Sequence, residues 1–214
     1  MKTFLEQFDW GGLLSLVQRV LSVLLCLTVH ETCHGLAAYA LGDPTARKMR
    51  RLSLNPLHHI DWLGLASMVI CGFGWAKPVP VDMRYFKRPK SGMAVTALAG
   101  PASNFLLAFL LLFIASLTAR YAPAEPFAVW MYYFFLNTAV LSIGLGLFNL
   151  IPIPPLDGSK ALFSLLPERA YYTLMRYERY GMVILLLIVW LDIGGSSLSR
   201  AIYAVYSWMT GLFF

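Results

Sequence analysis

Two histidines and a glutamate stand at metal-binding spacing near the start of the chain. His30-Glu31-Thr32-Cys33-His34 reads H-E-x-x-H and falls within a long apolar run. On a helix, residues four apart share one face, so the two imidazoles can hold one zinc ion while Glu31 projects beside them. A metal-bound water has a pKa of about 7, and Glu31 could take its proton and deliver it to a leaving amine.

The alternative to a metal site is a polar cluster without a metal. In soluble helices, H-E-x-x-H also arises from solvated side chains. Here the motif lies inside an apolar helix, where ionisable side chains are costly in lipid and mark functional sites. A hydrogen-bonded cluster without metal remains as the second interpretation.

Catalytic zinc needs a third protein ligand, and Asp157 is the best candidate. It lies in Asn149-Leu-Ile-Pro-Ile-Pro-Pro-Leu-Asp-Gly158, where three prolines force the chain out of helix at the end of an apolar segment. Such a break is stable at membrane depth only if it is buried or lines a cavity. The alternative role for Asp157 is to cap a helix before Gly158.

Small and polar residues recur every four positions at Gly100, Asn104 and Ala108. This spacing lets helices approach closely. Asn104 would then lie on the packed face, where its amide could hydrogen-bond the site or a substrate backbone, or stabilise an oxyanion. Asn149 is a similar candidate, and a purely structural role is the alternative for both.

Other residues each admit two interpretations. His58 and His59 are expected to make hydrogen bonds at the membrane interface, with a part in the site as the sharper alternative. Cys33 is next to His34 and could compete for the metal or be oxidised. A packed thiol is the simpler interpretation. Residues 78–80 are expected to be extended; they could offer a strand edge to an unwound substrate, although an ordinary loop is simpler.

The elements that position these residues must lie in a membrane. Hydrophobic residues make up 58% of the 214 residues and charged residues 13%, against about 25% charged in a soluble domain. Too few charges remain to cover a surface in water. This excludes a soluble enzyme, a disordered tail and a nucleic-acid binder, and it makes the lipid bilayer the expected solvent.

Apolar runs predict an all-α polytopic membrane protein with five crossings, forming one domain over residues 1–214. A span needs about 20 mostly apolar residues. The apolar stretch 62–75 is only 14 residues long and is predicted to be re-entrant or extended; if it crossed, the count would be six. The five predicted spans are Leu13–Leu41, Gly92–Ala119, Phe127–Ile151, Gly181–Leu191 (extended backward through Tyr171–Tyr180) and Leu198–Phe214.

The basic residues predict the orientation. Under the positive-inside rule, they place the N-terminus outside, the C-terminus inside and the site toward the cytoplasm. Lys2, Arg120 and Arg200 would lie outside. The predicted inner loops hold 13 of the 17 lysines and arginines: Arg47, Lys48, Arg50, Arg51, Lys77, Arg84, Lys87, Arg88, Lys90, Lys160, Arg169, Arg176 and Arg179.

Taken together, these motifs resemble the site-2 protease family of intramembrane zinc metalloproteases. H-E-x-x-H, the G-x-x-x-N segment Gly100–Asn104 and the L-D-G segment Leu156–Gly158 follow one another in the family's order. The resemblance implies that His30, His34 and Asp157 bind one Zn²⁺ and that Glu31 is the general base.

The same resemblance implies the setting of the reaction. Substrates are expected to be single-pass membrane proteins cut within the bilayer, often to release a signalling factor. The compact form lacks the PDZ and CBS domains of many relatives, so regulation is expected from membrane partners or from self-association. A prokaryotic plasma membrane is the expected location.

The rival class is a non-catalytic membrane protein that binds or transports metal. Intramembrane histidines and acids also serve ion pathways. A transporter would be expected to show ligands at more than one depth or two similar halves. Neither feature is visible in the sequence, so hydrolysis is the favoured prediction.

Overall fold

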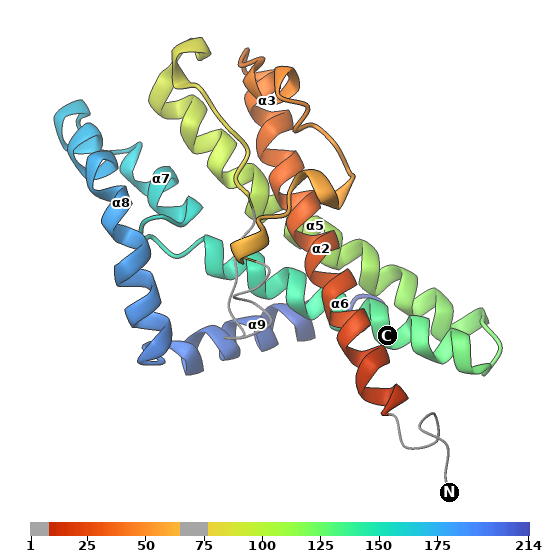
Figure 1. Cartoon of the computed structure of the whole chain (residues 1–214). Helices are drawn as coiled ribbons and strands as arrows, with labels where there is room; N and C mark the ends of the chain where they lie inside the picture. The colour runs from red at the N-terminus through yellow and green to blue at the C-terminus, as the bar shows by residue number, and fades with distance from the viewer. Residues whose placement is uncertain (1–8, 65–76) are drawn as a thin grey trace, which may run out of the picture.

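The computed structural model describes residues 9–64 and 77–214, and within these ranges regular structure is entirely helical, without strands (Figure 1). This confirms the predicted all-α class. Three helices are long and apolar enough to cross a membrane. They are α2 (Trp10–Ala40), α5 (Pro89–Tyr121) and α6 (Pro126–Asn149).

Local chemistry explains where the three long helices begin and end. The Asp9 carboxylate caps α2 by accepting the Gly12 N–H at 2.9 Å. Proline opens both α5 and α6 at Pro89 and Pro126, where its missing N–H costs nothing. Past Ala40 the chain turns at Gly42, which has φ +105°.

The long helices form one packed group, in which α5 contacts both α2 and α6 and α2 also contacts α6 (Figure 1). The predicted small-residue face of α5 lies inside this group, because Gly100, Asn104 and Ala108 are all buried. From Ala108 onward along α5, α9 (Gly195–Thr210) joins the packing. The apolar cluster there consists of Ala108, Leu111, Leu112, Ala139, Ile143 and Met209.

The predicted fourth and fifth spans form a bent pair instead of two clear crossings. The apolar end of α8 (Glu168–Trp190), from Tyr180 onward, meets α9 at 86°. The bend follows from positive φ at Asp192 (51°) and Gly194 (85°). The described residues therefore hold three candidate spans, or up to four, and the predicted five are not confirmed.

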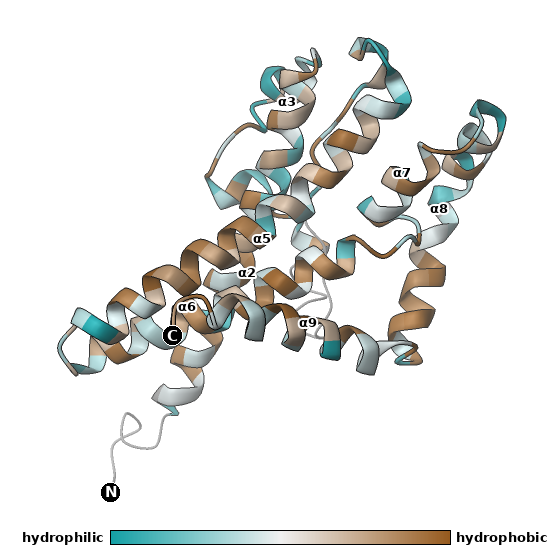
Figure 2. Cartoon of the chain, turned by 180° about the vertical axis from the view of Figure 1, so that it is seen from behind, coloured by the Kyte–Doolittle hydropathy of each residue, from teal (hydrophilic) through white to brown (hydrophobic). Residues whose placement is uncertain are grey.

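Short elements join the long helices on one side of the molecule. The structure describes the predicted non-crossing segment 62–75 only as far as Gly64. Its remaining residues, 65–75, lie outside the described residues. Figure 2 shows hydrophilic residues concentrated at the end of the molecule that carries α3 and the turn between α7 and α8. The short elements are α3 (Thr45–Lys48), the 3₁₀ turns η1 (Pro56–His58) and η2 (Met83–Tyr85), and α7 (Asp157–Phe163).

Candidate metal centre and catalytic cavity

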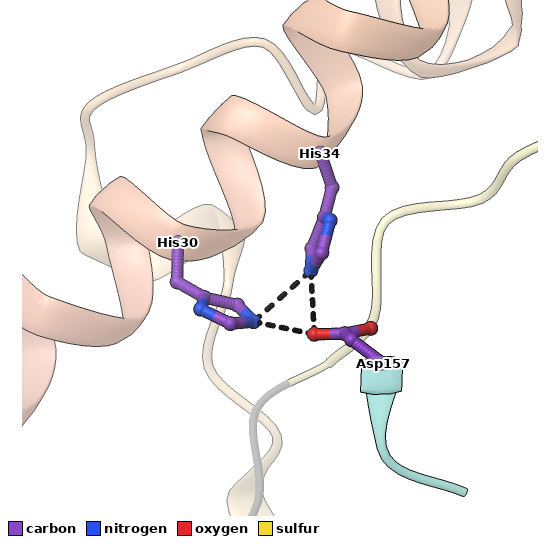
Figure 3. Close-up of side chains that lie close together, drawn as sticks. All are labelled: His30, His34 and Asp157. Atoms are coloured by element: carbon purple, nitrogen blue, oxygen red, sulfur yellow. Dashed lines mark hydrogen bonds and ion pairs between the residues drawn. The ribbon is translucent and has the colours of Figure 1, made fainter. Parts of the chain in front are cut away.

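Helix α2 presents His30 and His34 from successive turns of one face. The two rings meet edge to face, with centroids 4.5 Å apart and planes at 88°. Their residues are 4% and 8% exposed, so both imidazoles are held inside the protein. Their Nε2 atoms are 3.0 Å apart and point toward the same place (Figure 3).

Asp157 reaches the same point from the far side of a proline-rich turn. Helix α6 ends at Asn149 because the prolines at 152, 154 and 155 cannot continue its hydrogen bonding. Asp157 then begins α7, and its Oδ2 lies 3.1 Å from Nε2 of each histidine (Figure 3). A Cβ on Gly158 would lie 2.2 Å from the Leu150 carbonyl oxygen, so the turn requires glycine there.

The donor set fits a tetrahedral zinc site. His30, His34 and Asp157 each offer one ligand atom, and these atoms are mutually 3.0–3.1 Å apart. With bonds of about 2.0–2.1 Å, neighbouring ligand atoms of a tetrahedral zinc lie about 3.3 Å apart. The observed triangle is smaller by a few tenths of an ångström, and small side-chain shifts suffice to admit the ion.

Electrostatics also favour a cation at this point. Burial by itself would raise the pKa of the Asp157 carboxyl. Hydrogen bonds and charge from His30 and His34 outweigh burial and hold this pKa below its usual range. The carboxylate is therefore ionised at neutral pH, which is the form that binds a metal.

Glu31 shares a cavity with the three candidate ligands. The cavity measures about 340 Å³, and Glu31 is half-buried in its wall. Oε2 of Glu31 accepts a hydrogen bond from the Val79 N–H at 2.9 Å. The carboxylate is thus fixed beside the metal ligands by a segment 48 residues away in the sequence.

Val79 belongs to an extended segment, residues 77–82, that runs along the cavity. The Arg51 guanidinium, only 7% exposed as a residue, donates to the carbonyls of Lys77 and Pro78 at 3.3 and 3.2 Å. Fully buried Asp43 accepts the Asp82 N–H at 2.7 Å. Residues 77–82 form neither helix nor strand, and both ends of this segment are hydrogen-bonded to side chains of the stretch that follows α2.

The other residues singled out in the sequence lie at different places. Asn149 lines the cavity, whereas Asn104 is fully buried and is not among the described lining residues. His59 is buried, with Nε2 2.8 Å from the Ser53 carbonyl, and His58 is exposed. Cys33 is half-buried with a free thiol. Neither histidine joins the described metal ligands.

Sequence reasoning missed Arg51 and Asp43 as residues that shape the site. It treated Arg51 only as a loop charge that reports topology. The signal for a further role was weak, since nothing in the spacing connects these residues to the segment around Val79. A second missed feature is the ion pair Lys160–Glu178 in the cavity wall, with Nζ and Oε1 3.4 Å apart.

The chain is similar to known metalloproteases over most of its length. The model of peptidase family M50 matches residues 119–191. "Putative zinc metalloprotease YwhC" of Bacillus subtilis is 36% identical over 186 residues, which cover 86% of this chain and 85% of the relative. "Putative zinc metalloprotease Rip2" of Mycolicibacterium smegmatis is 30% identical over 171 residues, or 78% of this chain and 64% of the relative.

Rip2 of Mycobacterium tuberculosis shows a similar level of identity, 30% over 169 residues. No solved structure matches the chain. The identity to YwhC extends over most of both sequences, and the M50 match includes the proline turn and Asp157. The chain therefore belongs to peptidase family M50, the site-2 proteases, and is a membrane metallopeptidase.

Proposed function

We propose that this protein hydrolyses peptide bonds within or near the transmembrane helix of single-pass membrane proteins. The observation that carries the proposal is the convergence of His30, His34 and Asp157 within 3.1 Å, with Glu31 in the wall of the same cavity. These groups lie on or beside helices that are apolar enough to cross a membrane.

His30, His34 and Asp157 would hold one zinc ion, with Glu31 as the general base. Bound zinc would supply a Lewis acid for the substrate carbonyl and lower the pKa of a coordinated water. The Glu31 carboxylate would take the proton of the attacking water and return it to the leaving amine. The Val79 N–H holds Oε2 of Glu31, which fixes the carboxylate for this task.

The surroundings of the site support a membrane-protein substrate. A second, largely apolar groove of about 990 Å³ is lined by residues of α2, α6, α8 and α9. A groove of this composition suits an apolar helix. Because helical carbonyls are already hydrogen-bonded, the substrate would have to unwind before its peptide bond could enter the smaller cavity at Glu31.

We further propose that the active site lies toward the cytoplasmic face of a prokaryotic plasma membrane. His34 lies six residues before the end of α2, roughly 9 Å along the helix. The basic residues Arg47–Arg51 follow that end directly, and the positive-inside rule assigns them to the cytoplasm. Regulation would come from membrane partners or from a second copy of the chain.

The decisive experiment compares zinc content and cleavage in Glu31→Gln. The full chain is purified in detergent, reconstituted in vesicles and mixed with single-pass model substrates. Glu31→Gln should keep one zinc per chain and lose about 10²–10⁴-fold in cleavage rate, because the base is gone while all three ligands remain. Glu125→Gln is the matched control, since Glu125 is exposed and precedes α6.

Two outcomes would contradict the proposal. Cleavage by Glu31→Gln at the wild-type rate would remove Glu31 as the base. Wild-type protein that holds zinc yet cuts none of the substrates would favour the rival function, metal binding or transport without catalysis. Unchanged zinc content in Asp157→Ala, beside a loss in His34→Ala, would require another third ligand.

A further inference from the structure

The two candidate zinc histidines differ in their outer hydrogen bonds. Nδ1 of His34 lies 2.7 Å from the Thr96 carbonyl oxygen, an acceptor that fixes its tautomer with Nε2 free for the metal. Nδ1 of His30 is buried and has no partner among the described residues. Metal-binding histidines nearly always donate this second N–H, and a buried unpaired donor costs about 1–3 kcal/mol.

Asn104 offers the missing acceptor. Its side chain is fully buried, and neither Oδ1 nor Nδ2 has a hydrogen-bond partner within the described residues. A buried carboxamide without a partner is as costly as the unpaired imidazole N–H. The two unpaired groups are complementary, because Nδ1–H donates and Oδ1 accepts.

The packing of α5 on α2 places Asn104 and His30 at neighbouring positions along the two helices. A Cβ on Gly100 would lie 2.7 Å from Cε1 of His30, so α5 touches the imidazole at that position. Asn104 is one turn further along the same face of α5. The two helices run in opposite directions (Figure 1), so this turn moves toward Cys26, one turn before His30 on α2.

Contacts on the other side of Asn104 confirm this placement. Ser142 of α6 donates its hydroxyl to the backbone carbonyl of Asn104 at 2.8 Å, and the Cys26 thiol lies 3.8 Å from the carbonyl oxygen of Thr138, one turn earlier on α6. Asn104 thus lies between the layer of Gly100 and His30 and the layer of Cys26 and Ser142. The Ser142 hydroxyl donates to the Asn104 backbone, and in the neighbouring layer the unpaired Nδ1 of His30 is the complementary group.

A second unpaired group on α5 is the hydroxyl of Thr96. Thr96 lies one turn before Gly100 on α5, and its carbonyl oxygen is the hydrogen-bond partner of Nδ1 of His34. His34 is one turn nearer the end of α2 than His30. The positions along the two antiparallel helices therefore pair Thr96 with His34 and Asn104 with His30.

We propose that Asn104 is a positioning residue for His30. Its carboxamide oxygen accepts a hydrogen bond from the Nδ1–H of His30, directly or through one buried water, and keeps Nε2 turned toward the metal. This role rests on the proposed zinc site, and it differs from the oxyanion role expected from the sequence. A fully buried carboxamide that does not line the cavity is better placed to orient a ligand than to touch substrate.

The test measures zinc affinity, not cleavage. Full-length protein in detergent is titrated with zinc against a chromophoric chelator, and the thermal unfolding of the metal-free protein is recorded in parallel. Asn104→Leu, similar in size but apolar, should bind zinc about 10–100-fold more weakly. Asn104→Asp keeps the acceptor and should bind at least as tightly as the wild type, while Ser142→Ala, the control, should not change zinc affinity.

A double-mutant comparison separates an effect on His30 from an effect on the fold. In a His34→Ala background, Asn104→Leu should weaken the residual zinc binding further. In a His30→Ala background it should add nothing, because the group that Asn104 orients is gone. An equal loss in both backgrounds would show that Asn104 acts on the bundle as a whole and would overturn the proposal.

Other outcomes are equally informative. Wild-type zinc affinity in Asn104→Leu, or a loss in Thr96→Val instead, would reject Asn104 as the partner of His30. Asn104→Ala carries the same expectation as Asn104→Leu, so misfolding of one variant still leaves a test. Failure of the wild type to bind zinc would reject the proposed function itself, which distinguishes the two failures.

Discussion

Replacing Gly100 with alanine should disrupt zinc binding through a single added methyl group. A Cβ at this position would lie 2.4 Å from Nε2 and 2.5 Å from Cε1 of His34, and 2.7 Å from Cε1 of His30. Real Cβ atoms essentially never come within 3.0 Å of such neighbours. The backbone of α5 is packed against α2 and α6, so the imidazoles must move instead.

The size of the effect follows from that displacement. Relief of the 2.4 Å contact to 3.0 Å requires a shift of 0.6 Å at Nε2 of His34, the atom that would bind the metal. Metal–ligand distances are normally held within about 0.2 Å. Loss of an outer-sphere partner alone costs about 10–100-fold in affinity. Displacement of a ligand atom should cost at least about 100-fold, or about 2.7 kcal/mol.

The measurement is a competition titration of zinc on Gly100→Ala, with unfolding of the metal-free protein as a second readout. Alanine is favoured over glycine in a helix by about 1 kcal/mol, which partly offsets the steric cost in the metal-free state. The loss should therefore appear mainly in zinc affinity. Gly144→Ala is the control, since its Cβ would meet only the Ile202 side chain at an ordinary 3.4 Å.

One result would refute the reasoning. If Gly100→Ala bound zinc as tightly as the wild type and Gly144→Ala did the same, the imidazoles would not be pressed against α5. The metal would then be held elsewhere, or α5 would be free to move away from α2. A loss of zinc affinity of similar size in both variants would instead indicate a general effect of rigidifying the bundle.

Two further predictions concern the walls of the two cavities. Arg51→Met removes the guanidinium that holds the carbonyls of Lys77 and Pro78, so the segment beside Glu31 should lose part of its attachment; cleavage should fall about tenfold or more while zinc content, measured by metal analysis, is unchanged. Leu141→Trp narrows the large apolar groove and should slow cleavage of membrane-embedded substrates but not of short soluble peptides. Leu117→Trp is its control, because Leu117 of α5 is 39% exposed against 37% for Leu141 and lies outside the described lining. Equal cleavage of membrane substrates by both tryptophan variants would argue against docking in the groove.

The convergence of the metal ligands was predictable because each signal is local. H-E-x-x-H fixes the relative position of His30 and His34 on any helix, and three prolines before Asp157 mark a break that a membrane tolerates only in a protected place. The expected meeting of these segments needed only one assumption, that both lie near the same membrane surface. The distances of 3.1 Å to Asp157 agree with it.

The number of spans was not predictable in the same way. Apolar length identifies α2, α5 and α6, whose character is uniform along the helix. In α8 the first half is charged and only the second half is apolar, so hydropathy alone does not say whether the helix crosses. The 86° bend after it depends on the backbone at Asp192 and Gly194, which a count of apolar residues does not register.

Hydrogen bonds between residues that are distant in the sequence could not be predicted either. The hydrogen bond from Val79 to Glu31 joins residues 48 apart, and nothing in either local pattern specifies it. Asn104 was recognised as polar on a packed helix face. Whether its amide points into the cavity or behind the histidines depends on the rotation of α5 about its axis, which the four-residue spacing leaves open.

The two sides of the catalytic cavity meet opposite physical requirements. The ligand side must be rigid, and it is formed by α2 against α5, where Gly100 leaves no free space beside the imidazoles. The other side must admit a peptide segment. It includes Glu178 of α8, a helix that makes its main helix contact with α7. The Lys160–Glu178 ion pair on this side is a part-exposed contact between α7 and α8, and such pairs contribute at most about 1 kcal/mol. The start of α8 is held more firmly, because fully buried Tyr171 contacts Met83 and lies beside Lys90 of α5. Entry of a peptide beside Glu178 would therefore disturb a weak contact and would leave the metal ligands in place.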